Sequence, residues 1–333
     1  MDRLDSTSSS ASIFDYLKLH SIVLIWGVTA ILGKWVTIPA VETVLYRTLI
    51  SAIVLAFFVK KNEWKISSKF IFQLLFTGMI VGAHWITFFA AAKVANVSIC
   101  LVGLSTASLW TAFIEPVFNK KKVKLYEVFL GLVIIGGLYV IMKADLENDM
   151  ILGLILGVIS AILAALFSTI NGKLTHLAEP NTITVLEMSG ASIGIILFLP
   201  FYSVYFTGTE GIDIVLKNNT VYFQEGEWFF DVINSIYLNT DIVMIFALAI
   251  ICTVYTYSVS IELLRRMTVF VTNLTINLEP VYGIVLAAIF FNEHEKMDSS
   301  FYIGAAIILL SVLSYPIFNY TNKKIKKKKS KLK

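Results

Sequence analysis

Charged side chains are scarce in this sequence, and their scarcity excludes an ordinary soluble protein. Of the 333 residues, 15% are Asp, Glu, Lys or Arg, whereas a typical soluble domain carries about 25%. Hydrophobic residues make up 57% of the chain. A soluble protein of this length could not bury so much apolar surface, but a lipid bilayer is itself an apolar solvent. The composition therefore predicts an integral membrane protein.

Signatures of catalysis and metal binding are also missing from the sequence. The two cysteines, Cys100 and Cys252, lie within apolar runs, and the four histidines lack the spacing of a metal site. There is no His-Glu-x-x-His, Gly-x-Ser-x-Gly or Gly-x-x-x-x-Gly-Lys motif. The basic residues are not interleaved with aromatic ones as on a nucleic-acid-binding surface. We therefore expect no enzyme activity, no metal or other cofactor, no ATP-driven pump and no nucleic-acid partner.

Long apolar runs fill most of the chain instead. A membrane-spanning helix needs about 20 mostly apolar residues. The polar tail at 1–19 lacks the pattern of a cleavable signal peptide, so the first apolar run is expected to remain as a span. Ten runs are predicted to cross the membrane: 20–38, 41–59, 69–92, 95–118, 125–142, 151–170, 181–202, 241–262, 267–291 and 301–320.

Basic residues set the expected orientation of these spans, because cytoplasmic loops are enriched in Lys and Arg. If the N-terminus lies in the cytoplasm, most of the 27 Lys and Arg fall in cytoplasmic segments, including the lysine-rich tail at 321–333. The loops on the other side are acidic instead. This alternation predicts that both termini lie in the cytoplasm. We expect a multi-pass protein of the plasma membrane, such as the inner membrane of a bacterium.

An internal repeat divides the chain into two halves. The Phe-Asn pair at 118–119 recurs at 291–292, and in both copies a glycine follows the asparagine at the same spacing, at Gly131 and at Gly304. When the sequence is aligned with itself at these pairs, Lys93 falls on Arg266. Repeats of this kind predict that each half folds as one similar unit.

A second match, near the start of the chain, locates an insertion in the second half. The Val-Leu pair at 44–45 recurs at 185–186, which is a shorter separation than that of the Phe-Asn pairs. The long outside loop at 203–240 accommodates the difference. We therefore predict a first five-helix repeat at 20–146 and a second at 147–320. Because five is odd, the second repeat enters the membrane from the opposite side. The predicted fold is an all-α integral membrane protein of ten transmembrane helices in two inverted five-helix repeats.

Three segments of the second half carry a family resemblance: 272–283, 291–293 and 302–306. Together they resemble the C-terminal signature of the EamA family in the drug/metabolite transporter superfamily. The resemblance implies ten helices in two inverted halves around a central cavity. It also implies export or exchange of small organic metabolites. The first spans also resemble this family, at Trp26-Gly27, Lys34 and Tyr46-Arg47.

Ionisable residues inside the apolar runs are the first candidates for binding a solute. A charge at the centre of a bilayer costs about 2.5–3.5 kcal/mol on insertion scales, so such groups usually face the bundle interior. Arg47 could capture a carboxylate with its guanidinium fork, or it could form a packing ion pair. Glu279, beside Pro280, could bind an ammonium group or a proton, or it could be structural. Glu187 lies in the seventh span at nearly the position that Arg47 has in the second.

Aromatic and amide side chains complete the candidate site. An apolar pocket with a few polar groups would suit a small organic solute. The alternatives are lipid-facing aromatic rings and amides that join helices. The candidates of this kind are Trp26, His84, Trp85, Tyr255 and Asn277.

The sequence as a whole predicts a secondary transporter that exports or exchanges an amino-acid-like or drug-like metabolite by alternating access. An intramembrane enzyme and a membrane sensor without transport are the alternatives. The expected partners are the solute and the lipid bilayer, and the expected assembly is a monomer or a homodimer.

Overall fold

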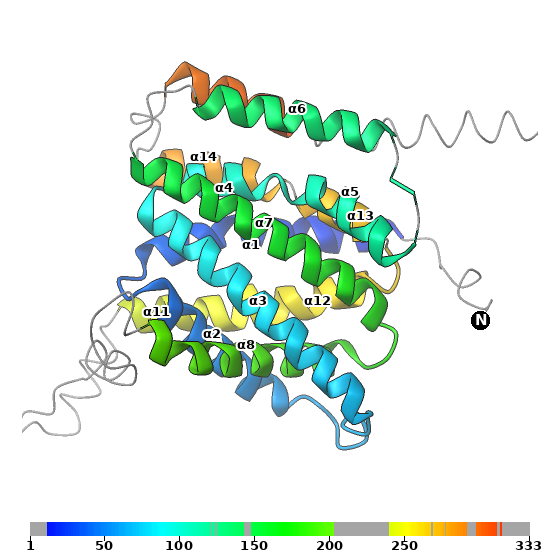
Figure 1. The fold of residues 1–333 in the computed structure, drawn as a ribbon. Coiled ribbons are helices and arrows are strands. Elements are labelled where there is room, and N and C mark those ends of the chain that lie inside the picture. Colours follow the sequence, from blue (N-terminus) through cyan, green and yellow to red (C-terminus); the bar gives the residue numbers. More distant parts are fainter. Residues whose placement is uncertain are drawn as a thin grey trace, which may run out of the picture.

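The computed structural model describes residues 12–120, 122–123, 125–142, 148–202, 240–267, 269–276, 278–291, 298–311 and 314. Within this part of the chain the regular elements are all helices, and they lie side by side in one bundle (Figure 1). The all-α architecture predicted from the sequence is therefore confirmed. The N-terminal tail up to residue 11, the basic tail at 321–333 and most of the predicted insertion at 203–240 fall outside the described residues.

The helices begin and end where the sequence supplies the chemistry for it. The first helix starts with a capping box, in which the Ser12 side chain accepts a hydrogen bond from the Asp15 amide and the Asp15 carboxylate accepts one from the Ser12 amide. Pro39 stands just before the second helix. The helices of the first half are α1 (Ile13–Trp35), α2 (Ala40–Ala56), α3 (Ser68–Val94), α4 (Val97–Leu104), α5 (Ala107–Phe118) and α6 (Leu125–Met142).

Among its described residues, the second half contains a segment of π-helix within a longer helical stretch. The helices of this half are α7 (Asn148–Leu174), α8 (Pro180–Tyr202), α11 (Thr240–Ala249), the π-helix η2 (Ile250–Tyr255), α12 (Thr256–Leu263), α13 (Val269–Ile276), α14 (Glu279–Phe291) and a helix at Ser299–Ser311.

Six of the described helical stretches are long and apolar enough to cross a membrane. They are Ile13–Trp35, Ser68–Val94, Val97–Phe118, Asn148–Leu174, Pro180–Tyr202 and Thr240–Leu263. The other predicted spans coincide with shorter helices, among them α2 with 17 residues and Ser299–Ser311. The multi-pass character is therefore clear, and the count of ten spans stays a prediction.

Two of the predicted spans are broken in the middle, which the sequence-based prediction of continuous helices missed. The predicted span 95–118 is divided into α4 and α5 at Ser105 and Thr106, whose hydroxyls donate to backbone carbonyls three residues back. The predicted span 267–291 is divided into α13 and α14, and Pro280 lies in the first turn of α14. Proline there cannot donate a backbone hydrogen bond to the preceding turn, so it favours a new helix start.

Close backbone contacts hold the centre of the bundle together. Helix α3 packs most extensively against α8 and α7. A Cβ atom at Gly78 would lie 2.0 Å from the carbonyl oxygen of Glu187, and one at Gly190 would lie 2.1 Å from that of Leu75. Only glycine permits this approach, which brings the backbones of α3 and α8 into direct contact.

Helix α6 and the helix at Ser299–Ser311 form an outer layer at one edge of the bundle (Figure 1). Ile134 and Ile141 pack with Phe301 and Ile308 in a separate apolar cluster. Large apolar side chains such as Leu132 remain exposed on α6. A surface of this kind suits contact with lipid.

Candidate functional site

A cavity lies in the middle of the bundle, between helices of both halves. The centres of water-sized groups can occupy a volume of about 90 Å³ inside it. Because one water molecule needs about 10–15 Å³ by this measure, the cavity has room for several. Its walls combine aromatic rings with a few polar groups. The lining residues are Trp26, Thr29, Arg47, His84, Trp85, Phe88, Leu104, Ala107, Ala164, Phe167, Ser168, Asn171, Tyr257, Ser260, Ile261, Leu264, Thr272, Asn273, Ile276 and Glu279.

Both broken helices meet this cavity at their breaks. Leu104 ends α4 and Ala107 begins α5, and both residues line the cavity. Ile276 ends α13 and Glu279 begins α14, and both of these also line it. Discontinuous helices in transporters place backbone groups and helix ends at a central binding site. The breaks therefore lie where a solute site would need them.

Arg47 is fixed in place from three directions, although its side chain is only 1% exposed. Its Nε donates to the Thr253 hydroxyl at 2.6 Å, and its Nη2 donates to the Cys252 carbonyl at 2.9 Å. Its Cζ lies 4.0 Å from the centroid of the Trp85 ring, within the range of a cation–π contact. Its Nη1 has no hydrogen-bond partner among the described residues.

The acceptors for Arg47 come from the π-helix η2. The Thr253 hydroxyl itself donates to the carbonyl of Leu248, five residues back, and this matches the wider π-helical turn. The Cys252 carbonyl also accepts from the Thr256 hydroxyl at 2.8 Å. Single π-helical turns inside α-helices occur frequently at functional sites.

Glu279 stands at the start of α14 and is 7% exposed. Among the described residues we find neither a hydrogen bond nor a direct ion pair that engages its carboxyl group. It does interact electrostatically with Arg47. The cavity therefore carries one basic and one acidic group that are close enough to influence each other but do not neutralise each other by direct contact.

Aromatic rings form much of the cavity wall. The ring of Trp85 lies 5.9 Å from that of Tyr257 in an edge-on arrangement, and Phe167 lies 6.3 Å from Tyr257. Such rings provide an apolar surface on which an organic group can pack.

His84 joins α3 to α7 at the cavity wall. Its Nδ1 lies 2.9 Å from the Ser160 carbonyl and 2.8 Å from the Ser160 hydroxyl, and its ring lies 5.4 Å from that of Phe167. Asn273 has a similar role on α13, since its amide donates to the hydroxyls of Thr111 and Ser168, each at 2.9 Å. Both side chains hold helices together and face the cavity at the same time.

The structure brings together five of the eight residues that the sequence proposed. Trp26, Arg47, His84, Trp85 and Glu279 all line the cavity. The role of each in binding a solute stays a prediction.

The other three candidates have different positions. Glu187 is fully buried behind the cavity wall, where its Oε2 accepts hydrogen bonds from Tyr257 and Asn171. The side chain of Tyr255 is 49% exposed and is not part of the lining. Asn277 lies outside the described residues.

Helix α7 contributes lining residues that the sequence reasoning missed. Ser168 and Asn171 face the cavity together with Phe167. The sequence held a signal for one of them, because an asparagine within an apolar helix needs a polar partner.

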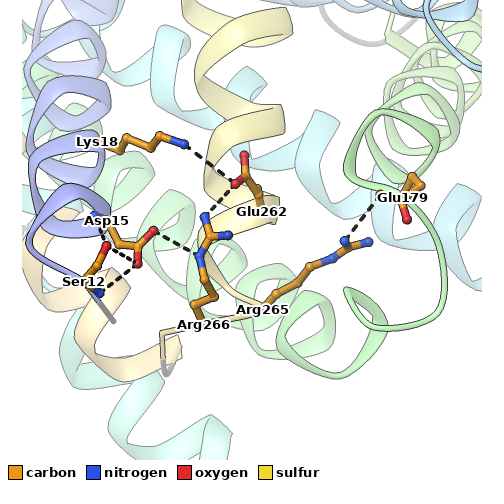
Figure 2. A network of polar contacts seen from close by, with 7 residues as sticks. All are labelled: Ser12, Asp15, Lys18, Glu179, Glu262, Arg265 and Arg266. Carbon is orange, nitrogen blue, oxygen red and sulfur yellow. Dashed lines mark hydrogen bonds and ion pairs between the residues drawn. The ribbon is translucent and has the colours of Figure 1, made fainter. Parts of the chain in front are cut away.

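A network of charged residues lies at the end of the bundle where α1 begins and α12 ends (Figure 2). Arg266 contacts Asp15 on α1 at 3.0 Å and Glu262 on α12 at 2.6 Å, and Lys18 lies 3.8 Å from Glu262. The hydrogen bond to Glu262 raises the pKa of Arg266 above its ordinary value, so the guanidinium remains charged. We refer to Asp15, Lys18, Glu262 and Arg266 as the α1-start cluster.

The neighbouring residue Arg265 ties the same end of the bundle to the α7–α8 connection. Its guanidinium donates to the Thr175 carbonyl at 2.8 Å and to the Ala178 carbonyl. It also lies 3.4 Å from Glu179 (Figure 2). Leu264, immediately before it, lines the cavity.

A second charged group lies at the opposite end, where α1 ends and α11 begins. Lys34 donates to the carbonyl of Ala92 at 2.7 Å, and Lys93 donates to the carbonyl of Val36. Asp241 accepts from the amide of Thr37 at 2.8 Å. We refer to Lys34, Lys93 and Asp241 as the α1-end cluster. At both ends of α1, polar contacts thus join this helix or the residues just after it to α3 or to helices of the second half.

Comparison with known proteins adds independent findings. The model of the EamA-like transporter family matches residues 16–143 and 151–315. The "Uncharacterized transporter YxxF" of Bacillus subtilis (strain 168) is 23% identical over 302 residues, which are 87% of this chain and 86% of that protein. A solved structure described as "Crystal structure of protein" has 13% sequence identity and a TM-score of 0.57, over 91% of this chain and 96% of that one. That likeness shows a shared fold.

Proposed function

Because this chain belongs to the EamA-like transporter family, we propose that it is a secondary transporter that exports or exchanges a small amino-acid-like solute by alternating access. The family and the transporter-named relative make it a membrane transporter of the drug/metabolite type, embedded through several helices in a lipid bilayer. They favour transport over the alternatives of an intramembrane enzyme or a sensor. The relative from Bacillus supports a bacterial plasma membrane as its location.

The observation that carries the solute class is the pair Arg47 and Glu279 in one cavity. Arg47 has an unpartnered Nη1, and the Glu279 carboxyl has no hydrogen bond among the described residues. A guanidinium is suited to a carboxylate, and a carboxylate is suited to an ammonium group. A solute with both groups would satisfy both side chains at once. The neighbouring rings of Trp85 and Phe167 would pack against its organic part.

Alternating access is supported by the similarity between the two halves. The break between α4 and α5 and the break between α13 and α14 occur at equivalent places when the Phe-Asn pairs at 118–119 and 291–292 are aligned. Lys93 of the α1-end cluster and Arg266 of the α1-start cluster are equivalent in the same alignment. Two halves with matching parts at opposite ends could open the cavity to one side at a time. We propose on this basis that the repeats are inverted, with both termini in the cytoplasm.

Substitution of Glu279 tests the proposed function. We expect Glu279→Gln to abolish or uncouple flux of a ¹⁴C-labelled mixture of neutral amino acids in proteoliposomes, while expression and folding remain intact. A lost ion pair with the solute corresponds to a decrease of about tenfold or more, since 1.4 kcal/mol is a factor of ten.

Asp149→Asn is the matched control, because Asp149 is exposed at the start of α7 and lies away from the cavity. This variant should transport like the wild type. Flux of Glu279→Gln at the wild-type rate would disprove the role of Glu279. Absence of any amino-acid flux in the wild type would disprove the solute class.

A further inference from the structure

Glu187 is a buried acid beside the cavity that the proposed solute site does not use. It lies on α8 and is 0% exposed, and the close contact between α8 and Gly78 of α3 seals it from one side. Its side chain does not line the cavity, but Asn171 and Tyr257, which do line it, both touch its carboxyl group. These two side chains therefore connect Glu187 to the cavity.

The hydrogen bonds of this cluster leave acceptors without donors. The Tyr257 hydroxyl donates to Glu187 Oε2 at 2.8 Å. The Asn171 amide donates to the same Oε2 at 3.3 Å and to the Tyr257 hydroxyl oxygen at 3.2 Å. All hydrogens of the cluster are then used. Glu187 Oε1 and Asn171 Oδ1 are buried and have no partner among the described residues. Buried polar atoms are rarely left unpaired, so the cluster lacks a donor.

Within the part of the chain that the structure describes, no cation compensates a negative charge at this position. The polar groups that act on the Glu187 carboxyl are Tyr257 and Asn171, both uncharged, whereas Arg47 acts on Glu279. His84, on the neighbouring face of α3, is held by Ser160. The other charged or titratable groups on α2, α3, α7, α8 and α12 are Glu42, Tyr46, Lys69, Lys93, Asp149, Lys173, Tyr202 and Glu262. Among the described residues none of these contacts Glu187.

From this geometry we propose that Glu187 is a proton-binding site of the transporter and is linked to the solute through Tyr257 and Asn171. A proton on Oε1 turns one of the two unpaired acceptors into a donor and removes an uncompensated charge from the interior of the bundle, where such a charge is costly. When the proton leaves, it passes through the Tyr257 hydroxyl, which takes it from the carboxyl group and gives its own hydrogen to a water molecule in the cavity. The carboxylate keeps the hydrogen bonds from Tyr257 and Asn171. This inference rests on the proposed function only for its link to transport.

The link to the solute follows from competition for two donors. The Tyr257 ring packs edge-on against Trp85, on which the Arg47 guanidinium stacks, so Tyr257 belongs to the end of the cavity assigned to a carboxylate. A solute carboxylate and an ionised Glu187 compete for the Tyr257 hydroxyl and the Asn171 amide. Binding of the solute therefore favours proton uptake by Glu187, and by reciprocity the proton favours the solute. The solute and the proton should then move in the same direction, so that an outward solute gradient drives both during export.

The proton on Glu187 can be measured without any solute. We expect infrared spectra of the full-length protein in lipid nanodiscs to contain the carbonyl stretching band of a protonated carboxyl group at neutral pH. That band should be lost in Glu187→Gln and retained in Tyr257→Phe and in the control Asp149→Asn. A band that Glu187→Gln leaves unchanged, or its absence from the folded wild type, would overturn the proposal. Comparison with Glu279→Gln and Glu42→Gln separates the contribution of Glu187 from those of the other buried glutamates.

The coupling is measured in weakly buffered proteoliposomes with an internal pH dye and the ¹⁴C-labelled amino-acid mixture. The wild type should acidify the interior when the mixture is added outside, and solute flux should rise as the external pH falls. Glu187→Gln and Tyr257→Phe should both lose this acidification, and the flux of Glu187→Gln should no longer depend on pH. Proton movement that persists in Glu187→Gln would disprove the link. If no amino acid moves but the infrared band belongs to Glu187, the proposed solute class fails and the proton site stands.

Discussion

At the scale of single residues, the polar groups of the bundle interior are separated into distinct roles by what they touch. Arg47 and Glu279 face the cavity, whereas Glu187 contacts Tyr257 and Asn171 behind its wall. All three are ionisable groups in predicted spans, and the sequence alone proposed each of them as a residue that binds a solute. The difference lies in side-chain contacts between helices, which no local pattern encodes. Two charges that could pair with a solute and one that could hold a proton are what a coupled transporter needs.

Arg47→Lys tests whether the shape of the guanidinium matters in addition to its charge. Lysine keeps the charge, but it cannot donate to Thr253 and Cys252 while it also stacks on Trp85. We expect an increase in KM of about tenfold or more for amino-acid flux, corresponding to about 1.4 kcal/mol. The measurement is saturation kinetics in proteoliposomes. A KM equal to that of the wild type would show that a positive charge alone suffices and that binding of the solute carboxylate does not depend on the guanidinium shape.

At the scale of secondary-structure elements, glycine decides which helices meet at the centre. The contact between α3 and α8 depends on Gly78 and Gly190, each of which faces the partner backbone at a distance that leaves no room for a side chain. The same contact buries Glu187. Helix breaks complete the arrangement, because they expose helix ends to the cavity. The positions of these breaks follow from Pro280 in one case and from hydroxyl-to-backbone hydrogen bonds of Ser105 and Thr106 in the other.

Two alanine substitutions with opposite expectations test the packing of α3 on α8. Gly78→Ala places a Cβ atom 2.0 Å from the Glu187 carbonyl oxygen, so the helices must separate. We expect a loss of about 1–3 kcal/mol in the free energy of unfolding. Gly136→Ala on α6 meets nothing within 4 Å and should leave stability equal or raise it by about 0.5–1 kcal/mol. Thermal and denaturant unfolding in detergent compares them. Equal stability of the two variants would contradict the close contact.

At the scale of the whole molecule, the cavity lies between two groups of polar contacts. The α1-start cluster joins α1 to α12, and the α1-end cluster joins α1 to α3 and α11. Opening one end while the other stays closed would require one group to separate at a time. Such contacts are individually weak when they are partly exposed, on the order of 1 kcal/mol or less, so they can break during each cycle.

Cysteine accessibility tests this arrangement at both ends. We would introduce Ser168→Cys at the cavity wall, in a chain whose Cys100 and Cys252 are replaced by alanine. Arg266→Ala should raise the rate at which a membrane-impermeant thiol reagent labels this cysteine from the side of the α1-start cluster. Asp241→Asn should raise the rate from the other side. Equal acceleration from both sides by either variant would argue against separate clusters that close the two ends.

The amino-acid sequence by itself determined that this protein lies in a lipid bilayer, that its fold is helical and which family it belongs to. These properties follow from composition, from the length of apolar runs and from the motif at 272–283. None of these depends on which helices are in contact. The sequence also predicted five residues that line the cavity, because polar and aromatic groups within apolar helices tend to face the interior. It missed the division of two spans and the contribution of α7. Those depend on which helix faces which, and only the tertiary structure decided that. For the same reason, only the structure shows that Glu187 lies behind the cavity wall and that Tyr255 is exposed. The backbone contact at Gly78 sets the position of Glu187, and the π-helical turn sets the direction of the Tyr255 side chain.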